Sequence, residues 1–372
     1  MILDFLLAII VFAFVITIVI TVHELGHFLA AKITKTKVTE FVIGFPPFIF
    51  KRQIGETLFG IGAIPFGGYN KIYGESETAE DVKDPKSFTS KTTTQKLFII
   101  ISGVVGNLIL SALIFYIILF SSNFSAEIGL LNQDYKFPLG HQENYLLIGA
   151  IEENSPAFLG GIKPNELLLD INNQRIQDPS ELSSLLNKTK EQEILVKTRN
   201  RETNQINTYH LQNETGLIGI GYTAITEVSY RSLKDKVFSG VFHTYNFADY
   251  SLSTLGNIIG KSVKEKDLSI AGNAVAGPVG IFAITKISMK EGFMHMLNLI
   301  AIISLALGIT NMLPIPALDG GKCVYLLFQK INPKFFTDEL SEKIDGIGFL
   351  LLIFLGVLII IKDVFQFKDL IF

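Results

Sequence analysis

Four long apolar stretches dominate the pattern of hydrophobic and polar positions along the chain. They span residues 5–22, 97–120, 293–313 and 346–361. A helix that crosses a bilayer needs roughly 20 apolar residues, within a range of about 17–25. Each stretch is therefore predicted to span a membrane, the fourth at the short end of the range. The first lacks a basic leading segment and a small-residue cleavage site, so we interpret it as a retained helix and not as a signal peptide.

Composition agrees with a membrane protein. Of the 372 residues, 48% are hydrophobic and 18% are charged, which is more apolar than an ordinary soluble chain. The net charge of -3 provides no broad basic field, so the lipid bilayer and not nucleic acid is the expected partner. The single cysteine, Cys323, excludes an intramolecular disulfide.

The distribution of Lys and Arg predicts the orientation. No Lys or Arg precedes the first apolar stretch, whereas the connection 32–96 is rich in both, and further Lys residues follow the third stretch. Cytoplasmic loops carry such an excess. We therefore expect 32–96 and 322–345 on the cytoplasmic side, and residues 121–292 and both termini outside.

The outer stretch divides into three parts. Residues 121–145 are interpreted as a linker, and residues 146–222 alternate short apolar runs with turn residues, as in a small mixed α/β domain. Residues 223–292 are predicted to form amphipathic helices on the membrane surface. The predicted fold class is a polytopic α-helical membrane protein with one extracytoplasmic α/β domain. Its remaining parts are 1–31, 32–96, 97–120, 293–321, 322–345 and 346–372.

A metal-binding pattern follows the first apolar stretch directly. His23-Glu24-Leu25-Gly26-His27 is a HExxH motif, whose histidines share one helix face and can reach one metal. Glu24 is then placed to take a proton from a zinc-bound water, whose pKa zinc lowers to about 7. HExxH also occurs by chance in unrelated proteins. Here it follows an uncharged membrane helix, where ionisable residues are costly and usually functional.

The third zinc ligand is predicted to be Asp319. Catalytic zinc takes three protein ligands and keeps one position open. Asp319 closes the third apolar stretch at the cytoplasmic end, where the first stretch also carries its histidines. The alternative is that Asp319 caps a turn, which suits the sequence Asp-Gly-Gly. The predicted cofactor is one catalytic Zn²⁺.

Two prolines interrupt the segment before Asp319. Pro314 and Pro316 break a helix, and unwound backbone at membrane depth is tolerated only inside protein or beside a water-filled cavity. A peptidase needs both water and an open backbone for its substrate. Asn311 is equally suited to hydrogen-bond the substrate or a developing oxyanion, or to join two helices of the bundle.

At these motifs the sequence resembles the site-2 protease family, in the bacterial branch that includes the regulator of sigma-E protease. The resemblance covers nearly the whole chain and rests on His23–His27 and on residues 311–321. Two further stretches match: Gly277-Pro278-Val279-Gly280, and residues within 60–69 that resemble the membrane-associated β-hairpin of the family. Residues 102–107 depart from the family pattern, because valine replaces proline while Asn107, a possible supporting residue, keeps its place.

The resemblance implies a function as well as a fold. It implies that His23, His27 and Asp319 bind zinc and that Glu24 is the general base. Substrates would be single-pass membrane proteins such as anti-sigma factors or remnant signal peptides, often trimmed first by a site-1-type protease. The location would be the bacterial inner membrane. The hairpin would clamp substrate as an added strand through its residues Ile64, Pro65, Phe66, Gly67, Gly68 and Tyr69.

Residues 153–172 resemble a bacterial PDZ domain. Such domains bind extended peptides at a sheet edge. Two roles remain open from the sequence: a peptide site, and a filter that excludes substrates with large outer domains, which we slightly favour. The acidic run at 75–80 is interpreted as a solvated loop.

Three other functions account for part of the pattern. A membrane-anchored PDZ scaffold without catalysis would have no need of Glu24. A zinc peptidase for soluble peptides would not need the uncharged run before His23. A metal transporter would explain intramembrane histidines and carboxylates, but not a glutamate between two ligands or the PDZ-like domain.

Overall fold

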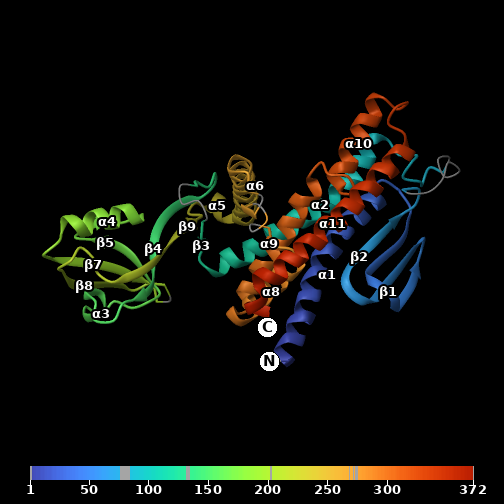
Figure 1. The fold of residues 1–372 in the computed structure, drawn as a ribbon. Coiled ribbons are helices and arrows are strands. Elements are labelled where there is room, and N and C mark those ends of the chain that lie inside the picture. Colours follow the sequence, from blue (N-terminus) through green and yellow to red (C-terminus); the bar gives the residue numbers. More distant parts are fainter. Residues whose placement is uncertain are drawn as a thin grey trace. The chain divides into compact units, whose positions relative to one another are not determined.

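The computed structural model describes residues 2–75, 84–130, 135–201, 203–267, 269–270, 272 and 275–371. It divides into two compact units (Figure 1). The first comprises Met1–Ile118 and His243–Phe372, and the second comprises Leu119–Phe242.

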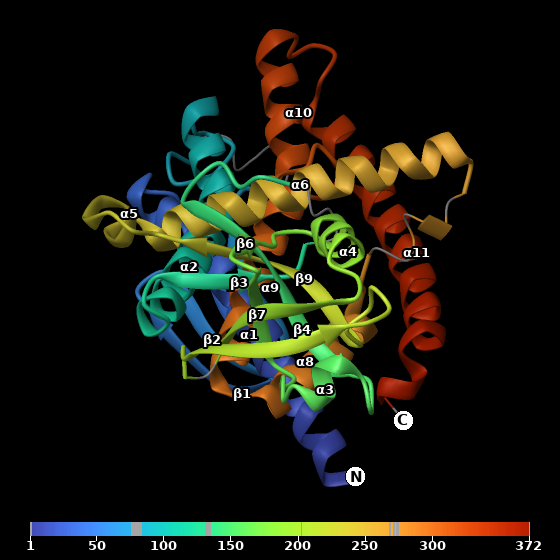
Figure 2. The same cartoon turned by 90° about the vertical axis from the view of Figure 1, so that its left-hand side faces the viewer.

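Four helices of the described chain are long and apolar enough to cross a membrane. They are α1 (Ile2–Ile33), α2 (Thr93–Ser121), α9 (Phe293–Met312) and α11 (Asp338–Ile371). Figure 2 shows α11 as one continuous helix. The four predicted apolar stretches fall on these four helices. Helix α2 begins earlier than its apolar stretch because Thr92 and Gln95 form a capping box: the Gln95 amide donates to the Thr92 hydroxyl, and the Thr92 amide donates to the Gln95 side chain.

A two-stranded antiparallel hairpin follows α1 and lies against it (Figure 1). Its strands are β1 (Val38–Ile54) and β2 (Thr57–Ile72), and the Thr17 hydroxyl of α1 donates to the Pro65 carbonyl at 2.7 Å. The hairpin leaves Phe45, Ile49, Phe50, Ile64 and Phe66 exposed. Apolar side chains in such a row are unfavourable in water and favourable in lipid, which agrees with the predicted membrane association.

Three further helices of the described chain lie wholly or mostly in the first unit: α6 (Ser239–Glu265), α8 (Pro278–Glu291) and α10 (Asp319–Ile331). Phe282 of α8 packs edge to face on Phe5 and Phe12 of α1. The Gly277 and Gly280 amides at the start of α8 donate to the buried Asp363 carboxylate of α11 at 2.9 and 2.7 Å. The Gly-Pro-Val-Gly motif is therefore a helix start that is held by a carboxylate from another helix.

The second unit is built on one seven-stranded sheet, whose strand pairs are all antiparallel. Its main path is β3-β9-β4-β5-β7-β8, and β6 pairs with β5. The strands are β3 (Ser125–Ile128), β4 (His141–Ile151), β5 (Glu166–Ile171), β6 (Gln174–Arg175), β7 (Gln192–Asn200), β8 (Ile206–Asn213) and β9 (Ile220–Ser229). The short helices are α3 (Pro156–Leu159), α4 (Pro179–Lys188) and α5 (Leu233–Val237). Leu182, Leu185 and Leu186 of α4 join the apolar core beneath the sheet.

The boundaries of this unit differ from the expected ones. The segment 121–145, interpreted as a linker, contains β3 and the start of β4. Residues 223–229, expected to be helical, belong to β9, because β9 pairs with β4 over Ile220–Ser229 and with β3 over Thr226–Ser229. The segment 322–345, expected as a loop, contains most of α10 and the start of α11. The two strand segments were missed because they are stabilised by pairing with strands that are distant in the sequence, which leaves no local pattern.

Candidate metal centre

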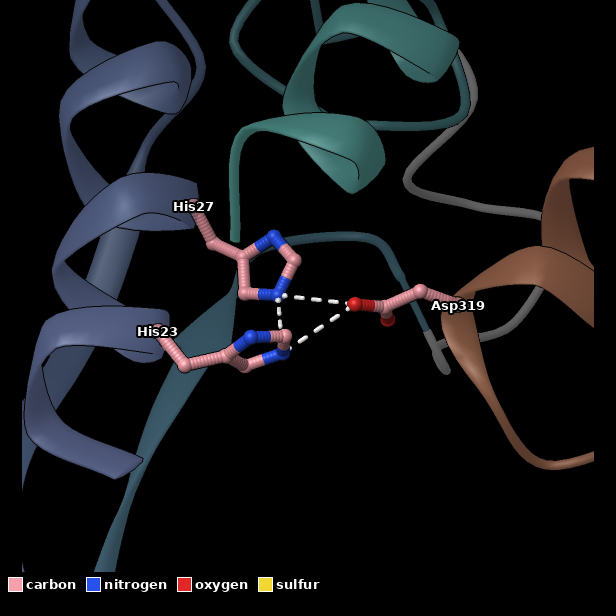
Figure 3. A group of neighbouring side chains, drawn as sticks. All are labelled: His23, His27 and Asp319. Atoms are coloured by element: carbon pink, nitrogen blue, oxygen red, sulfur yellow. Dashed lines mark hydrogen bonds and ion pairs between the residues drawn. The ribbon is translucent and has the colours of Figure 1, made fainter. Parts of the chain in front are cut away.

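Three side chains from distant parts of the chain point toward one another (Figure 3). His23 and His27 come from α1, and Asp319 is the first residue of α10. Asp319 Oδ2 lies 3.1 Å from His23 Nε2 and 3.4 Å from His27 Nε2, and the two Nε2 atoms are 3.1 Å apart. The structure thus brings together the three residues that the sequence predicts as zinc ligands.

This triangle of atoms has the dimensions of a zinc site. Zn–N and Zn–O bonds are about 2.0–2.2 Å long, so two ligand atoms of a tetrahedral ion lie roughly 3.3 Å apart. The three distances above match that separation. Asp319 Oδ2 and His23 Nδ1 are buried and make no conventional hydrogen bond among the described residues. Two imidazoles and one carboxylate also leave a fourth position for water or substrate, as in catalytic zinc sites.

Each histidine is fitted into its place by neighbouring backbone. His27 Nδ1 lies 2.9 Å from the Ile99 carbonyl, and donation to that oxygen leaves the Nε2 lone pair free for a metal. Gly103 makes room for both rings, because a Cβ there would lie 2.4 Å from His27 Nε2 and 2.9 Å from His23 Cε1. Gly26 lets α1 approach α2, since a Cβ there would lie 2.1 Å from the Ser102 carbonyl oxygen.

Asp319 is positioned by the glycines that follow it. A Cβ at Gly320 would lie 2.3 Å from the Met312 carbonyl oxygen, and one at Gly321 would lie 2.2 Å from that of Ile315. Only glycine allows α10 to start so close to the end of α9. The N-cap of α10 is Leu318, and no side chain caps the helix. In the structure, the Asp319 side chain therefore does not cap this helix, which was the alternative role.

A cavity of about 370 Å³ adjoins the cluster. Glu24 lines it together with the three candidate ligands, and Asn311 lines it as well. Pro314 and Pro316 are not among its lining residues. Leu313, which follows α9, has the extended backbone expected before proline.

The hairpin residues 64–69 and Asn107 do not line this cavity. Ile64, Pro65, Phe66, Gly67, Gly68 and Tyr69 lie on β2, and the Tyr69 hydroxyl donates to Glu40 at 2.8 Å. Burial and that hydrogen bond raise the pKa of Tyr69 to about 12. Asn107 is fully buried in α2 and its backbone carbonyl accepts from the Ser304 hydroxyl of α9 at 2.9 Å. This contact joins two helices.

Three polar residues that line the cavity were not predicted as site residues: Asn70, Glu75 and Lys322. Asn70 directly follows the glycine-rich part of β2, and Lys322 comes one helical turn after Asp319. Each is therefore next to a predicted site residue in the sequence, and that position could have identified it. Glu75 was assigned to a solvated acidic loop; the residue as a whole is exposed, and its carboxylate also pairs with Lys322 at 2.8 Å. Residues 76–80 lie outside the described residues. Glu75 raises the pKa of Lys322 above its ordinary value through its negative charge.

Comparison with known proteins assigns the family. The sequence profile of peptidase family M50 matches residues 11–355. This chain belongs to peptidase family M50. The match covers the HExxH motif and Asp319, and the expected membership in the site-2 protease family is confirmed.

Relatives of similar length carry matching names. A protein of Clostridium acetobutylicum named "Putative zinc metalloprotease" is 32% identical, with 93% of this chain and 94% of the relative covered. One of Clostridium perfringens with the same name is 30% identical over 93% of this chain and 95% of its own. An Arabidopsis thaliana protein named "Probable membrane metalloprotease ARASP2, chloroplastic" is 26% identical over 94% of this chain and 78% of its own. The M50 chain described here is a membrane zinc metalloprotease.

Proposed function

We propose that this metalloprotease hydrolyses peptide bonds within the membrane-spanning segments of single-pass membrane proteins. One observation carries the proposal. The HExxH motif lies inside the apolar helix that spans Leu3–Ile33, and its histidines meet Asp319 beside a cavity of about 370 Å³. A protease for soluble peptides has no need to place its metal on a helix of this kind.

The proposed roles follow from the donor atoms. His23, His27 and Asp319 would hold the zinc ion, and a bound zinc ion would supply a water of lowered pKa and polarise the scissile carbonyl. Glu24 accepts the proton of that water and then protonates the leaving amine. Asn311, whose side chain lines the same cavity, donates a hydrogen bond to the substrate backbone or to the developing oxyanion.

The substrate must be unwound before it reaches the metal. A two-stranded hairpin has an unpaired edge on each strand, and such an edge accepts an extended peptide as a further strand. We propose that residues 64–69 bind the substrate in this way. We propose that the non-helical segment between α9 and α10, which contains Pro314 and Pro316, also contacts the substrate.

The setting of the reaction is also a proposal. The excess of Lys and Arg in 32–96 favours a multi-pass protein of the bacterial inner membrane, with that segment in the cytoplasm and the second unit outside. The partners would be single-pass substrates, often anti-sigma factors or remnant signal peptides, and an upstream protease that trims them.

A groove in the second unit favours peptide binding as a second activity. The groove has a volume of about 770 Å³ and lies between α4 and the segment 215–222. Among the described strands, residues 220–225 of β9 have no partner on the side of β3, which pairs with Thr226–Ser229. We propose that an extended peptide adds to this edge, although a size filter remains the alternative.

The decisive experiment compares purified wild type with Glu24→Gln and Asp319→Asn. The probe is a single-pass test substrate without its outer domain, and mass spectrometry locates the cut. We expect a cut within the membrane span, a loss of at least about 10³-fold in Glu24→Gln because the base is missing, and loss of bound zinc in Asp319→Asn. A zinc chelator should abolish the cut and added zinc should restore it. Full activity of Glu24→Gln, or a normal zinc content in Asp319→Asn, would refute the assigned roles.

A further inference from the structure

A charged pair shares the catalytic cavity with the metal ligands. Lys322 Nζ lies 2.8 Å from Glu75 Oε1, and both side chains are half-buried lining residues of the cavity. The proposed mechanism uses neither of them. Among the described residues that line the cavity, Lys322 is the one lysine or arginine, and Glu24, Glu75 and Asp319 line the same cavity.

Lys322 has two carboxylates that compete for it. It stands three residues after Asp319 on α10, and side chains at this spacing are neighbours on a helix, so opposite charges attract. Its ammonium nevertheless bonds to Glu75, which comes from the segment after β2. Asp319 Oδ2 is left facing the two histidines.

Glu75 is held where it can make this contact. The Glu75 amide donates to the Ile72 carbonyl at 3.4 Å, and the preceding Gly74 has a φ of +74°. The neighbouring Tyr73 bonds to Lys37 and Phe88 through its backbone, at 2.9 and 2.8 Å. These hydrogen bonds hold the main chain of Glu75 at the base of the hairpin independently of α10.

We propose that Glu75 is a positioning residue that holds the Lys322 ammonium away from Asp319, so that the Asp319 carboxylate is free to bind zinc. This inference rests on the proposed role of Asp319 as a zinc ligand. Without Glu75, the ammonium would turn to Asp319, because opposite charges three residues apart on a helix attract each other. Zinc would then compete with Lys322 for Asp319.

A simpler role predicts a different result. If the pair only fastened α10 to the hairpin, removing either partner would loosen Asp319 to the same extent, and removing both would restore nothing. If Glu75 diverts Lys322, then Glu75→Gln weakens zinc binding, Lys322→Met does not, and the double variant recovers.

The test measures Zn²⁺ affinity by competition with a chelating dye, using the full chain purified in detergent. We expect about a 10-fold loss for Glu75→Gln, the lower end of the range for groups that orient metal ligands. Lys322→Met and the double variant should stay within about 3-fold of wild type. The control is Glu339→Gln, which breaks an exposed pair with Lys343 of the same 2.8 Å length and should leave the affinity unchanged.

Absorption of the Co²⁺-loaded proteins provides a second readout, because it reports ligand geometry without catalysis. Only Glu75→Gln should change the spectrum. Unchanged zinc affinity in Glu75→Gln, or a double variant as weak as Glu75→Gln, would overturn the proposal. If Glu75→Gln does not fold, a lowered affinity in Lys322→Met overturns it instead. A wild-type protein that binds no zinc would refute the proposed function itself and not this inference alone.

Discussion

The catalytic cavity and the groove of the second unit are built on different principles. The cavity is small, about 370 Å³, and brings charged and amide side chains together from α1, the hairpin segment and α10. The groove is about twice as large, about 770 Å³, and is lined mostly by apolar side chains and backbone from α4 and the segment 215–222. The first arrangement suits chemistry, since it concentrates charge where water can react. The second suits affinity for an extended chain, since it combines apolar contact with a part of β9 that is unpaired on one side among the described strands.

Gly103→Ala should produce the largest effect of the substitutions that separate the two sites. The added methyl would collide with both imidazoles, so we expect zinc affinity and proteolysis to fall about 10- to 100-fold. Peptide binding by the second unit should not change. Zinc content and cleavage rate check the first expectation, and peptide titration checks the second.

Gly356→Ala is the matched control for that substitution, since Gly356 also lies in a long apolar helix but has open space around its Cβ position. Equal zinc affinity in Gly103→Ala and Gly356→Ala would show that the imidazoles do not depend on the gap at Gly103.

Gly219→Ala is the corresponding change at the groove and should have an intermediate effect. Gly219 has a φ of +72°, and a Cβ there would lie 2.2 Å from Ser155 Cβ. We expect the second unit to lose about 1–3 kcal/mol of stability and its peptide affinity to fall, while zinc affinity stays at the wild-type value. Thermal unfolding measures the stability, and titrations of the same sample with peptide and with zinc measure the two affinities. A loss of zinc with the loss of peptide would mean that the two sites are coupled.

Ser183→Trp should have the smallest effect on the protein as a whole. Ser183 is an exposed residue of α4 that lines the groove, so a tryptophan there fills the groove without disturbing the core. We expect weaker peptide binding, with stability and cleavage of a short substrate unchanged. Ser184→Trp, on the same helix but outside the groove lining, is the control. Equal peptide binding in the two variants would favour the size filter over the peptide site.

Local sequence patterns were sufficient for the four apolar helices that can span a membrane and for the candidate metal ligands. An apolar run of spanning length predicts a helix whatever surrounds it, because backbone groups in lipid must be paired within the segment. His23 and His27 share a face through helical spacing alone. Asp319 was found through its position at the end of an apolar stretch.

Strand boundaries were harder to predict for a physical reason. Residues 223–229 carry no decisive local signal, and they form a strand because β4, far away in the sequence, offers them hydrogen-bond partners. The segment 121–145 was misread in the same way, because β3 exists only through its pairing with β9.

By itself, the sequence determined that this is a membrane protein with four apolar spans, a HExxH motif and an aspartate able to complete a zinc site. Those properties depend on composition and on spacing along one helix. The tertiary structure decided that Gly103 leaves room for the imidazoles, that Asn70 faces the cavity, and that Glu75 and not Asp319 takes Lys322. Each of these depends on which segments meet in space, and no periodicity along the chain records that, because the contacts join segments that are distant in the sequence.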